Sequence, residues 1–167
     1  MPRPVGVESD DELLCVLVDR GRSESPGMDF ESRIKARLWE QLPEGFELLS
    51  VSLGKAGASF QPCSATYVLP VRGEYLGSGF KARIKHLLAS ESLCLERKTG
   101  PEESKFKTVD VRGFLESIEL QDGCIIVQCK ISSTGTIRVE EILQLLELDV
   151  EKLSGPVRRT SVQWQEA

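Results

Sequence analysis

The segment from Lys105 to Asp149 constrains the fold more than any other part of this 167-residue chain, because its local structure can be read directly. Within it, the Asp122-Gly123 step separates two apolar runs. Such a step predicts a β-hairpin with a type I′ turn, since the central residues of that turn need positive φ.

The same segment then predicts a helix. Thr136 is the expected N-cap, and Glu140 and Glu141 fall in the first turn, where the helix dipole favours negative charge. The apolar residues that follow the loop recur at helical spacing. They are Val139, Ile142, Leu143 and Leu146.

The first part of the chain, residues 1–58, is expected to form a partial β-α-β unit. Apolar runs at Glu12–Asp19 and Phe46–Leu53 predict two strands, and the amphipathic stretch that begins at Asp29 predicts a helix between them. The small residues and proline of the stretch 54–62 mark the expected boundary.

Residues 59–167 are expected to form a second domain. Strands are predicted at 65–71, 93–97, 106–112, 114–120, 124–131 and 157–164, with one helix from Ser78 and another from the loop near Thr136. This order predicts an α+β fold of the ferredoxin-like split βαβ type with an extra strand. Two helices then cover one face of the sheet and leave the other free to bind a partner.

Composition limits the possible functions. The net charge of -5 excludes a generally basic nucleic-acid coat, although it allows a local basic patch. No apolar run approaches the roughly 20 residues that span a bilayer, and the first residues lack the apolar core of a secretory signal. We therefore expect a cytoplasmic protein without a membrane partner.

The five cysteines are scattered, and each lies in or beside an apolar run. We expect reduced, buried thiols, because no C-x-x-C pair or zinc pattern is present. No metal ligand, no catalytic residue and no cofactor is predicted. His86, the one histidine, falls off the apolar stripe of its helix and is expected to face solvent.

Lys105 and Lys107 flank Phe106 and are the first candidate binding residues. An aromatic ring between cations is typical of single-strand binding, in which the ring stacks on a base and the lysines hold phosphates. The plainer interpretation, a solvated loop with Phe106 in the core, is favoured by the sequence alone.

Two further candidate groups follow. Asp110 and Arg112 are two apart on a predicted strand, so they form either an ion pair on one face or an anion contact, and the ion pair is favoured. Thr134, Gly135 and Arg138 precede a helix, where free N–H groups bind anions. An ordinary helix cap is the favoured alternative there.

Five stretches of the chain match one known pattern: PRPVGVESDDELLCVLV near the start, LPEGFELLSV at Leu42–Val51, TVDVRGFLESIEL at Thr108–Leu120, STGTIRVEEILQLLELD at Ser133–Asp149, and Arg159-Thr160. Together they resemble the radical-SAM-linked proteins, a bacterial family whose biochemical role is unassigned. Two features differ from that family: Val139 stands where a proline is usual, and an upstream β-α segment is missing, so Met1 is expected to be an artificial or alternative start.

The resemblance implies an accessory or substrate-binding domain that acts beside a radical SAM protein on RNA or a ribosomal target. The chain lacks the closely spaced three-cysteine signature of radical SAM enzymes. A non-catalytic interaction module is therefore the favoured hypothesis. The alternatives are an RNA-modifying enzyme with a site around Asp110 and Arg112, and a structural support whose mark is an apolar patch on the first unit.

Overall fold

The structure is a computed structural model that describes residues 6–17, 28–55, 57–98 and 106–166. These residues form a mixed α+β fold with three α-helices and two sheets, so the predicted fold class is confirmed at that level. They divide into two compact units, one containing the residues up to Leu13 together with Phe60–Glu166, and the other lying within 14–59. No helix in the described residues is both long and apolar enough to span a bilayer.

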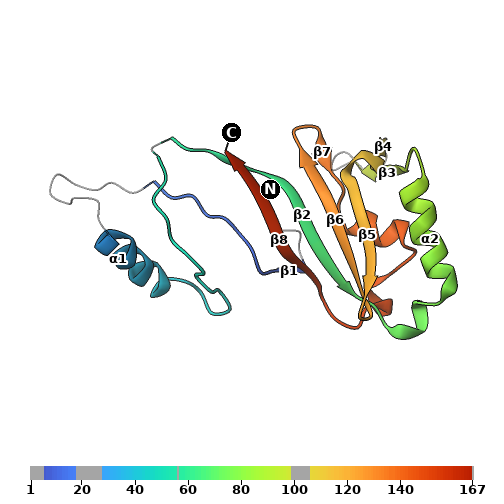
Figure 1. The fold of residues 1–167 in the computed structure, drawn as a ribbon, viewed down its shortest axis with the longest axis horizontal. Helices are drawn as coiled ribbons and strands as arrows, with labels where there is room; N and C mark the ends of the chain where they lie inside the picture. Colours follow the sequence, from blue (N-terminus) through green and yellow to red (C-terminus); the bar gives the residue numbers. More distant parts are fainter. Residues whose placement is uncertain (1–5, 18–27, 56, 99–105, 167) are drawn as a thin grey trace. The chain divides into compact units, whose positions relative to one another are not determined.

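The larger unit is built on one sheet with the strand order β1-β8-β2-β6-β5 (Figure 1). The neighbouring pairs β2–β6, β2–β8 and β5–β6 are antiparallel, whereas β1 runs parallel to β8. The short β7 pairs with the end of β6. The strands are β1 (Val7–Ser9), β2 (Phe60–Pro70), β5 (Leu115–Gln121), β6 (Cys124–Ser132), β7 (Gly135–Thr136) and β8 (Val157–Glu166).

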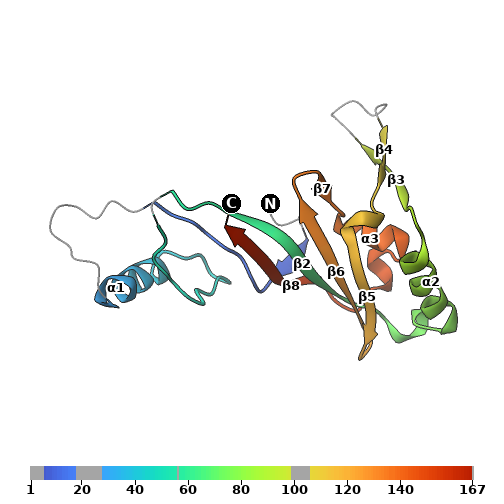
Figure 2. The same cartoon turned by 45° about the horizontal axis from the view of Figure 1, so that its top comes forward.

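Helices α2 (Ser78–Ala89) and α3 (Val139–Leu145) cover one face of this sheet, as Figure 2 shows. Alternate residues of the central strands point to that face and are buried, because side chains two apart on a strand share a face. Burying each large apolar side chain contributes roughly 1.5–3 kcal/mol as an upper estimate. The buried residues of these strands and helices include Ala65, Tyr67, Leu69, Ile84, Leu87, Ile125, Val127, Cys129 and Ile142.

A separate two-stranded sheet lies between α2 and β5 in the chain. It consists of β3 (Cys94–Lys98) and β4 (Phe106–Asp110), which pair antiparallel with Lys98 opposite Phe106. Figure 2 shows this hairpin projecting beyond the end of α2, clear of the main sheet. Three short 3-10 turns complete the unit: η1 (Gly73–Tyr75), η2 (Arg112–Phe114) and η3 (Val150–Lys152).

The predicted hairpin turn is confirmed. Asp122 and Gly123 have φ values of 49° and 78°, as a type I′ turn requires, and they join β5 to β6. The strands predicted on either side of the turn, and the closing strand near the C-terminus, are also present.

The smaller unit contains α1 (Met28–Trp39). Phe30 lies buried on this helix. Glu31 accepts a hydrogen bond from the N–H of Leu53 at 3.0 Å, and Lys35 donates to the carbonyl of Leu49 at 3.4 Å. These two bonds hold the segment after the helix against it. The helix predicted to begin at Asp29 is confirmed, because α1 covers that position.

The two strands predicted beside α1 are wrong. Neither the described part of Glu12–Asp19 nor Phe46–Leu53 forms a strand, and within 14–59 the described residues contain a helix and extended chain. An apolar run indicates burial but does not supply the neighbouring backbone that a strand must pair with. The strand of the N-terminal region is β1, which pairs with β8 in the larger unit.

The start of α3 also differs from the prediction. The helix begins at Val139 with Arg138 as N-cap, not at Thr136, which lies in β7. Thr136 instead donates from its hydroxyl to the carbonyl of Lys130 at 3.2 Å. Glu140 and Glu141 do lie in the first turn of the helix, as predicted.

Candidate functional site

The last described pair of the β3–β4 ladder presents an exposed aromatic ring beside a lysine. Phe106 is 59% exposed, so it does not lie in the core. Lys98 stands directly opposite it in the ladder, and both side chains share one face of the hairpin. Lys107 is exposed and pairs with Arg97 on the other face. Lys105 lies outside the described residues.

Arg97 anchors the hairpin to α3. Its Nε and Nη2 donate to the two carboxylate oxygens of Glu141 at 2.7 and 2.8 Å, and Nη2 also donates to the carbonyl of Thr136 at 3.0 Å. The two side chains are 17% and 7% exposed. A bidentate pair of this kind fixes orientation as well as contributing energy.

The Glu141 carboxylate accepts hydrogen bonds from both Arg97 and Arg138. Burial by itself raises its pKa, but the hydrogen bonds from the Arg97 guanidinium and the Arg138 N–H lower it more, so its pKa lies below the ordinary value of 4.5. The same carboxylate raises the pKa of Arg97. Both groups therefore stay ionised at neutral pH. The Nε and Nη2 donors of Arg97 are already bonded to Glu141 and Thr136, so they are not available to a ligand.

Asp110 ends β4 and shapes the turn that follows. Its Oδ1 accepts hydrogen bonds from the N–H groups of Leu93 at 2.8 Å and Arg112 at 3.0 Å. The N–H of Arg112, followed by that of Leu93, lowers the pKa of Asp110 below its ordinary value of 3.8. These bonds organise the base of the hairpin around a permanent carboxylate.

Arg112 does not share a strand face with Asp110, because β4 ends at Asp110 and Arg112 begins η2. Its guanidinium donates to three backbone carbonyls: Ser90 at 3.0 Å, Leu115 at 2.7 Å and Leu88 at 2.8 Å. Two of these carbonyls belong to the C-terminal end of α2. Arg112 thus closes the helix end, where cations are favoured.

A hollow of about 360 Å³ lies at the base of the hairpin. It brings together Asp110 and Thr134, which the sequence placed in separate candidate groups. Both a carboxylate and an ammonium group border it, together with hydroxyl groups that hydrogen-bond easily. Its lining residues are Asp110, Gly113, Phe114, Lys130, Ser132 and Thr134.

The other two candidates of the loop lie beside this hollow and do not line it. Gly135 has a φ of 137° and packs near the ring of Phe114, since a Cβ built on it would stand 3.7 Å from Cζ. Arg138 is exposed, and its Nη1 lies 3.7 Å from the Glu140 carboxylate. The hydroxyls of Ser132 and Thr134 are 2.8 Å apart.

Lys130 was missed by sequence reasoning. It is an exposed cation near the end of β6, directly after the buried Cys129, and it borders the hollow. The strand alternation around Cys129 places Lys130 on the uncovered face, but nothing in the sequence brings it near Asp110. Only the pairing of β6 and β5 does so.

The cysteines are all free, but not all are buried as expected. Cys129 is fully buried, and burial raises its pKa to about 12. Cys15 and Cys94 are exposed, while Cys63 and Cys124 are half-buried. Across the described residues, no group of three or more His, Cys, Asp or Glu side chains is arranged to hold a metal ion. His86 is exposed, as predicted.

Comparison with protein-family models gives a match, over residues 1–144, to a family described as "Uncharacterized protein conserved in bacteria (DUF2344)". Comparison with curated proteins gives no match. Comparison with solved structures gives none either.

Proposed function

The chain belongs to this uncharacterized bacterial family, and from that premise we propose that it is a non-catalytic accessory domain that recognises single-stranded RNA for a radical SAM system. The radical SAM link comes from the resemblance described above, and the proposed cytoplasmic location comes from the sequence, which has no apolar run long enough for a bilayer and no secretory signal at its start. The RNA contact is argued from the hairpin. A single observation supports it most: Phe106 is exposed on the hairpin with Lys98 opposite it.

An exposed ring between cations is suited to unpaired bases. Stacking of a base on an aromatic side chain contributes about 1–3 kcal/mol and tolerates any sequence, since every base has a π face. Lys98 lies beside the ring, and Lys107 lies on the opposite face of the same hairpin. Lys98 therefore lies where it can hold the phosphate of a base stacked on Phe106, whereas Lys107 adds only to the positive potential around the hairpin.

The hollow at the base of the hairpin extends the proposed surface. Phe106 and Asp110 are four residues apart on β4 and share a face, so they are separated by about 13 Å at the usual strand rise. This is enough for a second nucleotide. Lys130 at the hollow would hold its phosphate, and Thr134 and Asp110 would bond its ribose hydroxyls.

The enzyme alternative around Asp110 and Arg112 is less well supported. Arg112 donates from all three guanidinium nitrogens to backbone carbonyls, and Asp110 accepts from two backbone N–H groups. Both side chains therefore serve the turn between the hairpin and β5. Neither is positioned as a base beside a nucleophile.

We also propose that the larger unit follows the ferredoxin-like split βαβ plan. Four strands in the order β8-β2-β6-β5, with α2 after β2 and α3 after β6, support this assignment. Under this plan β1 extends the edge of the sheet. The β3–β4 hairpin is then an insertion between α2 and β5, and a natural place for a family-specific binding element.

The test is fluorescence anisotropy with a short, labelled single-stranded RNA of mixed sequence. Phe106→Ala is expected to weaken binding about tenfold or more, because it removes one stacked base. Lys98→Ala and Lys107→Ala should each weaken it by less. The slope of log affinity against log salt is expected to be about -1.4 for the two phosphate contacts, at Lys98 and Lys130.

Val150→Ala is the matched control, since Val150 is 77% exposed on η3 and lies outside the proposed surface. It should leave the affinity unchanged. Equal affinities for Phe106→Ala and the wild-type protein, or no RNA binding by the wild-type protein, would reject the RNA function.

A further inference from the structure

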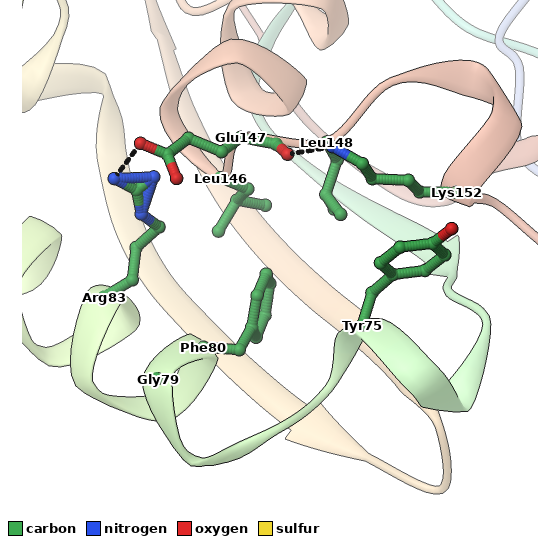
Figure 3. A pocket seen from close by; sticks show the side chains of 8 residues that line it. All are labelled: Tyr75, Gly79, Phe80, Arg83, Leu146, Glu147, Leu148 and Lys152. Atoms are coloured by element: carbon green, nitrogen blue, oxygen red, sulfur yellow. Dashed lines mark hydrogen bonds and ion pairs between the residues drawn. The ribbon is translucent and has the colours of Figure 1, made fainter.

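A small cavity of about 190 Å³ lies between α2 and the end of α3, away from the β3–β4 hairpin (Figure 3). Phe80, Leu146 and Leu148 form its apolar floor. Figure 3 shows Arg83 on one side of this floor, and Tyr75 with Lys152 on the other. The lining residues are Tyr75, Gly79, Phe80, Arg83, Leu146, Glu147, Leu148 and Lys152.

Arg83 lines this cavity, and one of its donors has no partner. One guanidinium nitrogen, Nη2, pairs with the carboxylate of Glu147. The other, Nη1, is buried and has no hydrogen-bond partner in the described structure. A buried donor without a partner is costly, so any acceptor that reaches it gains free energy.

Glu147 is held in an unusual backbone conformation. Its φ is 55°, and it follows Leu146, the C-cap of α3, at the position where glycine is the common choice. The N–H of Leu148 donates to the carbonyl of Leu143 at 2.9 Å, and that of Glu147 to Gln144 at 3.1 Å, which closes the helix end. This turn aims the Glu147 side chain at Arg83.

The Arg83–Glu147 pair is weak in spite of its contact. The Glu147 side chain is 72% exposed, and ion pairs that face solvent contribute little net stability. An incoming carboxylate that also reaches Nη1 would form the stronger, two-pronged contact that guanidinium groups favour. Glu147 is therefore easily displaced, and its carboxylate already marks where such a group binds.

Two more features favour an anion here. The N-cap of α2, Gly77, provides no side-chain cap, and the first turn has no acidic residue, while Gly79 of that turn lines the cavity. Lys152 is fixed at the opposite rim by bonds to the Glu147 carbonyl at 2.9 Å and to Asp149 at 3.1 Å. Its Nζ lies 5.9 Å from the centre of the Tyr75 ring.

We propose that this cavity binds a carboxylate attached to an apolar body of about one side chain in size, with the carboxylate on Arg83 in place of Glu147 and the apolar body on Phe80, Leu146 and Leu148. The volume suits a body of about this size, because sites that enclose drug-sized molecules measure about 300–1,000 Å³, so only the terminal group of a longer ligand would enter the cavity. Two sources have this chemistry: a free small acid, or the C-terminus of a peptide that ends in an apolar residue.

The test is isothermal titration of the full chain with hydrocinnamate and with a tetrapeptide that ends in Phe. The uncharged partners, hydrocinnamyl alcohol and the amidated peptide, are expected to bind about tenfold more weakly, since they cannot make charge-assisted bonds to Arg83. Tighter binding of the peptide than of hydrocinnamate identifies a peptide terminus as the natural source. Tighter binding of hydrocinnamate identifies a free acid as the natural source. Either result supports the site.

The proposal predicts opposite changes in hydrocinnamate affinity for two variants. Arg83→Met is expected to weaken hydrocinnamate about tenfold, whereas Glu147→Gly is expected to tighten it about threefold, because it removes the internal competitor and suits the left-handed backbone. Lys81→Met, an exposed cation on the same helix outside the cavity, is the control and should change nothing. Circular dichroism melting checks that all three variants fold.

The proposal is overturned if acid and alcohol bind equally, if the wild-type chain does not bind hydrocinnamate, or if Glu147→Gly fails to tighten binding. It is independent of the proposed RNA function. The Arg83 and Glu147 variants should leave RNA affinity unchanged, and Phe106→Ala should leave hydrocinnamate affinity unchanged.

Discussion

Arg112 holds the C-terminal end of α2 against the start of β5 through bonds to Leu88, Ser90 and Leu115. Three carbonyls in different directions need the planar fork of a guanidinium, because an ammonium group presents its donors from a single nitrogen. A residue that binds an external anion by charge alone tolerates lysine much better. The single substitution Arg112→Lys therefore distinguishes a structural role of Arg112 from the binding of an external anion.

Arg112→Lys is expected to lower the free energy of unfolding by about 2 kcal/mol, because a charged group loses part of its hydrogen bonding. Urea unfolding measures this change. Arg138→Lys is the matched control, since its side chain is about half exposed, and a shift within about 0.5 kcal/mol is expected there. An Arg112→Lys variant as stable as the wild-type protein would show that its bonds are not structural.

At the scale of the elements, the Arg97–Glu141 pair joins the hairpin to α3, and its loss is predicted to be costly. Glu141→Ala leaves the Arg97 guanidinium largely buried without its partner, so unfolding should require about 3 kcal/mol less, near the lower end for breaking a buried pair. Glu140→Ala removes the neighbouring exposed carboxylate and should cost no more than about 1 kcal/mol.

The same pair gives a pH dependence. Because the folded pKa of Glu141 is lowered, its contribution to stability is complete above its ordinary value of 4.5 and is lost as the pH falls through the folded pKa. The stability difference between the wild-type protein and Glu141→Ala should therefore be large at neutral pH and should shrink as the pH falls below 4.5. A difference that is constant with pH would contradict the ionised pair.

Local signals were enough to predict the elements that depend on local geometry. The Asp122-Gly123 turn follows from its need for positive φ, and α2 follows from its apolar stripe. The strand predicted at Phe46–Leu53 failed because strand formation depends on a neighbour that the sequence does not name. The roles of Arg97 and Arg112 were out of reach for the same reason, since their partners lie 44 residues and 22–24 residues away.

For the whole molecule, the two units differ in how well they bury apolar side chains. The larger unit contains the main core cluster, whereas the smaller one leaves many large apolar residues exposed. In the described residues of the smaller unit these side chains are Leu14, Val16, Leu17, Trp39, Phe46, Leu49 and Leu53.

This difference predicts the order of proteolysis. Dilute chymotrypsin should cut first at Phe46 and the leucines near it, which are exposed and lack strand pairing, while the strands β2, β6 and β8 of the main sheet resist. Mass spectrometry of the early fragments identifies the sites. Early cleavage inside β2, β6 or β8 would mean that the larger unit is not the stable part of the chain.

The central claim is that the β3–β4 hairpin is the RNA-binding element. Nuclear magnetic resonance tests it most directly, through backbone amide shifts recorded while single-stranded RNA is added to the labelled chain. We predict that the largest shifts fall on Lys98 and Phe106–Asp110, with smaller ones at Lys130 and Thr134 around the hollow. Shifts confined to other surfaces, or no shifts at saturating RNA, would contradict the account.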